Sequence, residues 1–446
     1  MSFAAKRIRI VVTRMLLLFA LIACQIPLTA ALHAADDPLY LNDLIEEGLK
    51  NSPDILASQA RTQAAGYRIS QAKSLPDPMF MFGYQNEGFQ RLTIGEAENA
   101  MGMSSLSQMF LFPGKRALKG EMAASDAESL AALSNGTKLR VTAQIKILYY
   151  DLFFAHKSID ILKDRAEFFS RIEDAAAARY ASGMGSQQEA LMAQTEKYML
   201  LEKEEMQLQR IQALQGMLNT TVGRDVNSPL GRPLEPGYTP FSAGLEELVR
   251  MAYDHSPEVK SKKKMVEGAE AKVRMAKKEY YPDITIGASY FPRTQGMPDM
   301  WNLTATINLP IYYKTKQRQA VLEAQSGLSE AKREVQATEL MLSSNVRDSF
   351  SMLQAADRLM RLYNEGLIQK ASQDVQLAFS GYVTGKAEIL TVITRIKNLL
   401  DFDILYWNQF AEREKAIARL HAFTGGELPQ GPRHQQENNS SQGGTR

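Results

Sequence analysis

Side chains that commonly perform chemistry are few and scattered in this sequence. The five histidines lie far apart and form no metal-ligand spacing; they are His33, His156, His255, His421 and His434. The only cysteine, Cys24, excludes an internal disulfide and any cysteine-cluster metal site. The sequence contains no phosphate-binding loop, nucleophile elbow or metalloprotease motif. We therefore expect no catalytic residue, no cofactor and no resident metal.

One group of side chains has a known affinity for metals. Five methionines gather around a predicted pair of strands, namely Met79, Met81, Met101, Met103 and Met109. Thioether sulfur is a soft ligand that suits Cu(I). Methionine also fills irregular gaps between apolar side chains. The sequence alone favours this packing role over a role in conducting metal ions.

A tyrosine–glycine motif occurs twice and is followed by an acid. Arg179-Tyr180-Ala-Ser-Gly183 corresponds to Gly381-Tyr382-Val-Thr-Gly385, and Glu189 lies six residues beyond Gly183. Glycines in this setting end one helix and reverse the chain. A tyrosine hydroxyl bonded to an ionised carboxylate forms a charge-assisted hydrogen bond. Glu189 also fits the ordinary role of a solvated carboxylate at a helix start.

The charge balance excludes a nucleic-acid partner. The formal net charge of the 446 residues is +2, and residues 1–34 contribute four basic side chains without any acid. The remaining chain is therefore nearly neutral and lacks the basic patch that phosphate binding requires.

Residues 1–35 have the pattern of an export signal. A basic stretch precedes the apolar run 15–23, which is too short to span a bilayer as a helix. Cleavage after Ala34 or Ala35 suits ordinary signal peptidase. Leu21-Ile-Ala-Cys24 instead resembles a lipobox, which would end the signal at residue 23 and leave Cys24 lipidated. Both routes predict a destination beyond the inner membrane.

The rest of the chain is written twice. Asn51-Ser52-Pro53 recurs as His255-Ser256-Pro257, and the tyrosine–glycine motifs keep nearly the same offset. We predict a first repeat over 36–230, with strands near 78–88 and 101–112. A Pro- and Gly-rich linker covers 231–243, and a second repeat covers 244–425, with strands near 282–291 and 300–311. The polar tail 426–446 has the composition of a disordered segment.

Helix length is the most specific feature of each repeat. A proline-free helix over 115–180 would measure about 100 Å, whereas ordinary globular helices have about 8–20 residues. The stretches 53–75 and 187–219 are long enough together to run beside it. The second repeat has 315–381 beside 257–280 and 388–424. Each repeat's first helix starts at Ser-Pro, where serine suits a capping role. A simple coiled-coil rod would have no use for the strands.

The predicted strands are patterned for lipid on one side and water on the other. Ile284, Ile286, Ala288 and Tyr290 alternate with small or polar residues, and 301–309 alternates in the same way. Four strands cannot close a barrel, because about eight are the practical minimum. Open edges are not tolerated in lipid, so several copies must share one barrel.

Further motifs are Leu111-Phe-Pro-Gly-Lys-Arg116 and Ala416–Gly425, in addition to Ser52-Pro53 with its repeat and the doubled tyrosine–glycine motif. With these motifs the mature chain resembles the TolC-like family of outer-membrane efflux factors. Gly385-Lys386-Ala387-Glu388 and the segment after it resemble the heavy-metal branch of that family. The resemblance implies a mainly α fold with a small β part. Three copies would form a long periplasmic α-barrel and a 12-stranded transmembrane β-barrel.

The resemblance further implies a passive duct in the outer membrane. Its partners would be a periplasmic adaptor, also called a membrane fusion protein, and an inner-membrane pump of the RND or ABC type. The cargo would be metal ions or small toxic molecules. The alternatives are a channel for type I protein secretion and a periplasmic coiled-coil adaptor or scaffold. An enzyme would require a convergent catalytic cluster.

Family resemblance also assigns a gate and a docking tip. Tyr382 matches the family's gating tyrosine, with Glu189 as its acidic partner; Lys386, Glu388, Thr391 and Thr394 complete the expected gate. Ala387 replaces a family arginine, and Thr391 and Thr394 replace two aspartates, which puts the family's acidic ring in doubt. The expected adaptor-contact residues are Ser182, Gly183, Met184, Thr384, Gly385 and Lys386.

Overall fold

The computed structural model describes residues 38–93, 96–293 and 296–426. The predicted signal over 1–35, Cys24 and residues 427–446 of the predicted tail lie outside these ranges. Two compact units are present. Of the described residues, the helical unit contains 38–56, 138–252 and 344–426, and the sheet unit contains those within 57–137 and 253–343.

The predicted order of elements occurs in both halves of the chain. The first half contains α3 (Leu41–Asn51), α4 (Pro53–Lys73), β1 (Met79–Gln85), β2 (Met101–Phe110), α5 (Lys115–Ala181) and α6 (Gln187–Val222). The second contains α7 (Leu245–His255), α8 (Pro257–Lys278), β3 (Ile284–Phe291), β4 (Met300–Ile307), α9 (Gln317–Arg361), η1 (Leu362–Leu367), α10 (Ile368–Val383) and α11 (Ile389–Thr424). The mainly α fold class with a small β part is confirmed.

The second long helix differs from the single helix predicted over 315–381. A π-helical turn, η1, separates α9 from α10. Gly366 lies within this turn and has a low intrinsic preference for α-helix. The neighbouring Tyr363 packs against Phe402 of α11 at 6.3 Å between ring centroids. A π turn contains one residue more than an α turn. No pattern in the sequence predicted this additional residue.

The starts of α4 and α8 also differ from expectation. Short helices α3 and α7, which the sequence analysis did not anticipate, precede them directly. Ser256 is buried between α7 and α8 and makes no side-chain capping hydrogen bond. Its carbonyl instead accepts the Lys260 amide at 3.0 Å. The predicted capping role of this serine is therefore wrong: α8 follows α7 directly, and its first turn receives no side-chain hydrogen bond from Ser256.

Two strands end earlier than predicted for identifiable reasons. Strand β1 stops at Gln85, since the next residue, Asn86, accepts the Thr93 amide at 2.7 Å and closes the loop. Strand β4 stops at Ile307, and Pro310 lacks the amide hydrogen that would extend the ladder. The division into repeats at 36–230, 231–243 and 244–425 remains a prediction.

The sheet unit is built on one antiparallel sheet of order β1-β2-β3-β4. Strands β2 and β3 pair along their length and thereby join the two repeats, with Leu106 opposite Ala288. Within the described residues, β1 and β4 are the edges and have one neighbouring strand each. One face carries large exposed apolar side chains, including Phe80, Phe82, Trp301 and Leu303.

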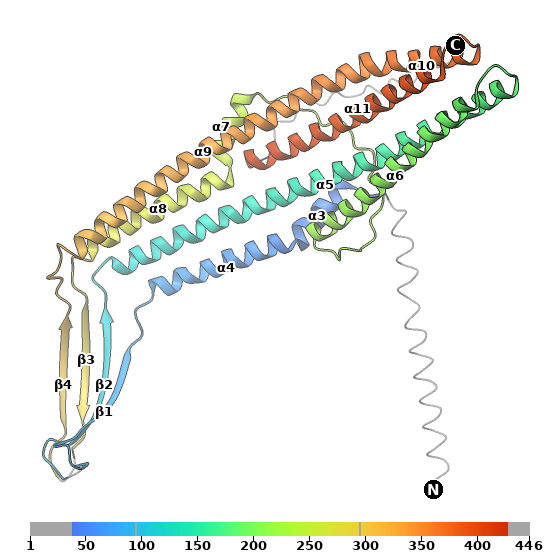
Figure 1. Ribbon diagram of the computed structural model, residues 1–446. Coiled ribbons are helices and arrows are strands. Elements are labelled where there is room, and N and C mark those ends of the chain that lie inside the picture. Colours follow the sequence, from blue (N-terminus) through green and yellow to red (C-terminus); the bar gives the residue numbers. More distant parts are fainter. Residues whose placement is uncertain (1–37, 94–95, 294–295, 427–446) are drawn as a thin grey trace, which may run out of the picture. The chain divides into compact units, whose positions relative to one another are not determined.

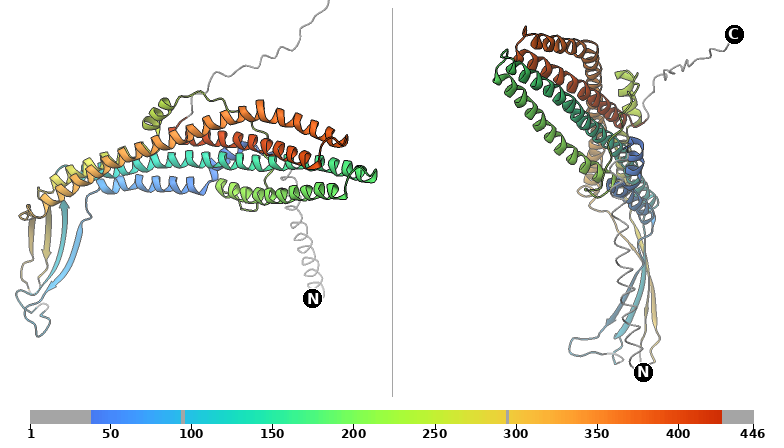
Figure 2. Two further views of the ribbon diagram at one scale, coloured as in Figure 1. Left: turned by 45° about the horizontal axis from the view of Figure 1, so that its top comes forward. Right: turned by 90° about the vertical axis from the view of Figure 1, so that its right-hand side faces the viewer.

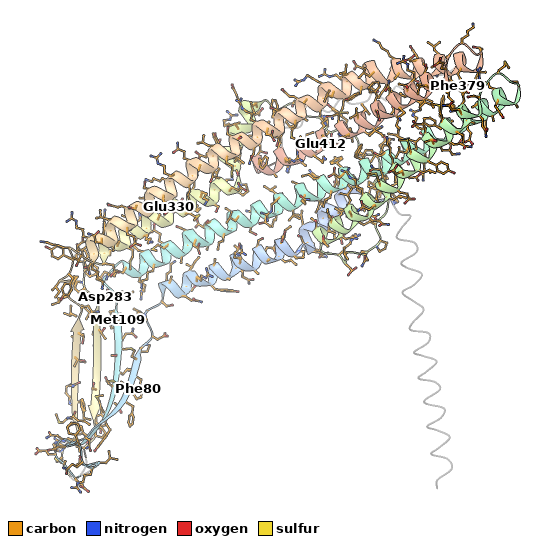
Figure 3. All side chains as sticks on the ribbon, viewed as in Figure 1. Phe80, Met109, Asp283, Glu330, Phe379 and Glu412 are labelled. Atoms are coloured by element: carbon orange, nitrogen blue, oxygen red, sulfur yellow. The ribbon has the colours of Figure 1, made fainter. Side chains whose placement is uncertain are left out.

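A buried lysine ties the strand-to-helix corners of the two repeats together. Lys115, at the start of α5, is 1% exposed. Its ammonium donates to the Tyr281 carbonyl at 3.0 Å and to Asp283 at 3.1 Å. Asp283, labelled in Figure 3, also accepts the Phe112 amide at 2.7 Å. The rings of Phe112 and Tyr281 stack at 4.4 Å, so both corners share one polar and one aromatic contact.

In the helical unit, α5 with α6 and α10 with α11 form two antiparallel hairpins (Figure 1). Both views of Figure 2 keep these hairpins side by side. Their shared core contains Phe153 of α5, which packs edge-on against Trp407 and Phe410 of α11 at 5.7 and 6.0 Å between ring centroids. Side chains of both repeats therefore pack together in this core. No helix among the described residues combines the length and apolar character needed to cross a membrane.

The segment between the repeats is held by buried charges. Arg413 and Glu414 of α11 are 1% and 2% exposed. The Arg413 guanidinium donates to Asp357 of α9 at 2.7 Å and lies 3.5 Å from the ring centroid of Tyr238. The Thr239 hydroxyl donates to Glu414 at 2.6 Å. These contacts fix the linker residues Tyr238 and Thr239 against α9 and α11.

Replacement of Lys115 by methionine will destabilise the protein. The change keeps the apolar stem but leaves the Tyr281 carbonyl and the Asp283 carboxylate without their donor, which costs about 1–3 kcal/mol of unfolding free energy. Thermal unfolding in detergent measures the loss. Lys119→Met, one turn later on an exposed position, is the matched control. Equal melting temperatures for the two variants would contradict the role of Lys115.

Candidate functional site

Both helix hairpins reverse through the same backbone geometry. Gly183 and Gly385 have φ angles of +73° and +75°, in the left-handed region that favours glycine. In the first reversal, the Met184 amide donates to the Arg179 carbonyl at 2.9 Å. The equivalent Lys386 amide donates to the Gly381 carbonyl at 2.7 Å. The chain therefore presents two matching tips, one from each repeat.

The structure brings Tyr382 and Glu189 into direct contact. The Tyr382 hydroxyl donates to Glu189 Oε2 at 2.7 Å, and the residue is only 1% exposed. Tyr382 belongs to the hydrophobic core of the tips, together with Val392 and Ile393 of α11. Burial, followed by the hydrogen bond to the Glu189 carboxylate, raises the Tyr382 pKa well above its ordinary value. The phenol therefore stays protonated and serves as a donor to Glu189.

Arg179 completes this contact and was missed by the sequence analysis. It occupies the last turn of α5, and its guanidinium donates to the Tyr382 carbonyl at 2.8 Å and to the Met184 carbonyl at 3.0 Å. Its Nε lies 3.7 Å from Glu189 Oε2, and the guanidinium lies 4.9 Å from the ring centroid of Tyr382. One cation therefore engages the backbone of both reversals and both members of the tyrosine–carboxylate pair.

A signal for Arg179 was present in the repeat. Alignment of Tyr180 with Tyr382 places Arg179 at the position of Gly381 in the second repeat. Arg179 is therefore a charged side chain that only one of the two otherwise matching motifs carries. A cation in the last turn of a helix also interacts favourably with the exposed carbonyls. Its partners in the other repeat required knowledge of how α5 and α10 pack.

The remaining predicted gate residues do not join this contact. The residues concerned are all exposed, namely Lys386, Glu388, Thr391 and Thr394. The Thr394 hydroxyl donates to the Leu390 carbonyl of its own helix at 2.7 Å. Of the six predicted gate residues, the described contacts within the protomer therefore join only Tyr382 and Glu189. Arg179, which was not among the six, joins the same contact.

All six predicted adaptor-contact residues lie exposed on the tips, namely Ser182, Gly183, Met184, Thr384, Gly385 and Lys386. The Ser182 and Thr384 hydroxyls turn back and donate to the Ala178 and Ser380 carbonyls at 3.1 and 3.0 Å. The glycine backbone and the side chains of Met184 and Lys386 remain available for contact with another protein. The small residues at both tips, serine, threonine and glycine, permit close approach of another helical hairpin.

The described residues contain no group of three or more His, Cys, Asp or Glu side chains placed to hold a metal ion.

Comparison with known proteins matches both halves of the chain to one family. Residues 44–220 and 248–426 each match the model described as outer membrane efflux protein. The chain is 19% identical over 402 residues to the cobalt-zinc-cadmium resistance protein CzcC of Cupriavidus metallidurans, covering 88% of this chain and 91% of that protein.

Solved structures with a similar fold include VceC and CusC. The outer membrane protein VceC of Vibrio cholerae superposes with a TM-score of 0.75 at 21% identity, covering 86% of this chain and 96% of that one. A structure of CusC, described in terms of transmembrane channel formation, gives a TM-score of 0.76 at 13% identity and covers 90% and 96% of the two chains.

Replacement of Arg179 by alanine will loosen both helix reversals at once. The loss of one charge-assisted bond to a carbonyl at each reversal costs about 1.5–3 kcal/mol per bond, which corresponds to amide exchange faster by about tenfold to a hundredfold at each. Hydrogen exchange of the segments 180–189 and 380–389 measures this effect. Arg210→Ala, on an exposed position of α6, is the control. Faster exchange at the first reversal only would show that Arg179 does not couple the two.

Proposed function

Because the chain belongs to the outer membrane efflux protein family, we propose that it is the passive exit duct of a tripartite efflux system for metal ions. Family membership makes the chain an outer-membrane efflux channel with a helical periplasmic extension. Channels of this family act as trimers with an adaptor and an inner-membrane pump. The pump supplies the energy, so the duct itself needs no reaction chemistry.

The observation that carries this proposal is the sheet with one apolar face and two open edges. Apolar side chains exposed on one face of a sheet require a nonaqueous neighbour. The unpaired edges of β1 and β4 must find partners, since unsatisfied backbone groups are costly in hydrocarbon. Pairing β4 of one copy with β1 of the next satisfies both requirements and closes a barrel of twelve strands in a trimer.

The proposed cargo rests on the relationship to a metal-resistance protein. The relative that aligns over most of both chains is described by its resistance to cobalt, zinc and cadmium. Small toxic molecules are the second class of cargo that a duct of this family accommodates. A growth profile of a deletion strain against metals and drugs distinguishes the two classes.

We assign the closed state of the duct to the contact among Tyr382, Glu189 and Arg179. The contact ties the ends of the two helix hairpins within one protomer, at a tyrosine that is fully buried. Opening would require the hairpins to separate and this charge-assisted bond to break. The exposed tips around Gly183 and Gly385 are then the surface on which the adaptor acts.

Opposite faces of β4 will respond differently to a charge. Leu303→Lys places an ammonium on the apolar face, at a cost of about 2–4 kcal/mol in the middle of a bilayer. Thr304→Lys, the adjacent residue, places it on the polar face. Cell fractionation and heat-modifiable migration are expected to show an outer-membrane oligomer for the wild type and Thr304→Lys, and much less of it for Leu303→Lys. Wild-type protein in the soluble extract would refute the proposed duct.

Loss of the tyrosine–carboxylate bond will destabilise the closed channel. We expect Tyr382→Phe and Glu189→Ala each to raise the open fraction or the conductance of single channels in planar bilayers, because each removes the 2.7 Å hydrogen bond. Tyr180→Phe changes the equivalent tyrosine of the first repeat, which is 54% exposed, and serves as the control. Unchanged conductance of both variants would reject the assigned gate.

A further inference from the structure

The strand register places the clustered methionines on one face of the sheet. Met79 and Met81 of β1 lie opposite Ser107 and Ser105 of β2. Since side chains alternate along a strand, Met101, Met103 and Met109 of β2 share this face as well. We name these five residues the thioether face. Figure 3 labels Met109 on β2 and Phe80 on the neighbouring β1; by the register Phe80 belongs to the opposite, apolar face.

The thioether face lies on the polar side of the sheet. The other side chains on this side are mostly hydroxyls and amides, namely Gln85, Ser105, Ser107, Thr285, Ser289, Asn302, Thr304 and Thr306. None of the four strands places an Asp, Glu, Lys or Arg on it. Met79 and Met81 are 69% and 53% exposed, so they do not fill a core within the protomer.

The second repeat shows that the sheet does not require these methionines. At the repeat offset, Met81 corresponds to Thr285 and Gln85 to Ser289, and both pairs occupy the same face. Strands β3 and β4 form an equally regular ladder with mostly hydroxyl and amide residues there. The thioethers of the first repeat are therefore explained by their chemistry better than by folding.

Local packing brings methionine side chains of neighbouring strands to the same part of the sheet. A Cβ atom at Gly83 would lie 3.1 Å from the terminal methyl of Met103. Glycine at this position therefore lets the Met103 side chain cross onto β1, next to Met81 two residues away. Met79 and Met109 form a second diagonal pair of the kind that long side chains span. Met300 lies on the same face, but its sulfur already accepts a contact from Arg293 at 3.6 Å, and we leave it out.

We propose that the thioether face lines the water-filled interior of the barrel and transiently binds soft monovalent cations of the Cu(I) class as they leave. This inference rests on the proposed duct, which puts the apolar face toward lipid and the polar face toward the lumen. Thioethers are neutral soft ligands that prefer Cu(I), whereas hard cations prefer carboxylate, carbonyl and water oxygens. The absence of charged ligands on this face keeps binding weak. Weak binding at several sites is what conduction requires.

The test replaces sulfur while keeping side-chain volume. A variant with Met79, Met81, Met101, Met103 and Met109 all changed to Leu removes the ligands at little packing cost. The matched control changes five exposed helical methionines to Leu, namely Met199, Met206, Met217, Met265 and Met341. Single channels are recorded in planar bilayers in nitrate buffer, with Ag⁺ as the probe for a soft monovalent cation and Zn²⁺ for comparison.

We expect Ag⁺ to block the wild-type and control channels transiently. The variant with the five sheet methionines changed to Leu, the sheet variant, is expected to need at least about tenfold more Ag⁺ for the same block. This difference equals about 1.4 kcal/mol of binding free energy. Zn²⁺ is expected to act equally on all three. If the five-fold variant fails to assemble, Met81→Leu combined with Met103→Leu is measured instead. An Ag⁺ response that is absent from the wild type, or equal in the sheet variant, overturns the inference while the duct stands. Failure of the wild type to form any channel refutes the duct itself.

Discussion

The unpaired edges of the four-stranded sheet are the constraint on which the rest of this molecule depends. Each repeat supplies one hairpin, and the β2–β3 ladder fuses the hairpins into a single sheet with β1 and β4 at its borders. A sheet with an apolar face and open borders is incomplete as a monomer. Channels of the outer membrane efflux protein family act as trimers, and in the proposed barrel each copy pairs these borders with those of its neighbours.

Much of the fold followed from sequence patterns because those patterns report local physics. The absence of proline from 114 to 228, together with the glycines that follow Tyr180, predicted the 67-residue helix α5 almost to its ends. Strict alternation assigned the apolar face of β3 and β4 correctly. Features that depend on how distant elements pack were missed. The Arg179 contacts, the buried Lys115, the helices α3 and α7 and the missing side-chain cap of Ser256 are of this kind.

The two repeats share their backbone geometry but differ in the side chains at equivalent positions. Both reversals use a glycine with positive φ and the same amide-to-carbonyl bonds, yet arginine occurs in one and glycine in the equivalent position of the other. The buried tyrosine belongs to the second repeat and its acidic partner to the first. On the polar face of the sheet, the first repeat carries five methionines, and the second carries mainly threonine, serine and asparagine. A duplicated scaffold thus allows asymmetric pairs that identical halves would not form.

The π turn between α9 and α10 determines the direction in which the side chains of α10 point. One added residue rotates the following helix face by about 100° relative to an uninterrupted α-helix. Tyr382 points at Glu189 only because α10 leaves η1 in that phase. The stretch from Ile368 to Tyr382 is therefore free to accumulate substitutions on its solvent side, whereas its length is fixed: an insertion or deletion of a single residue would swing the phenol away from the carboxylate.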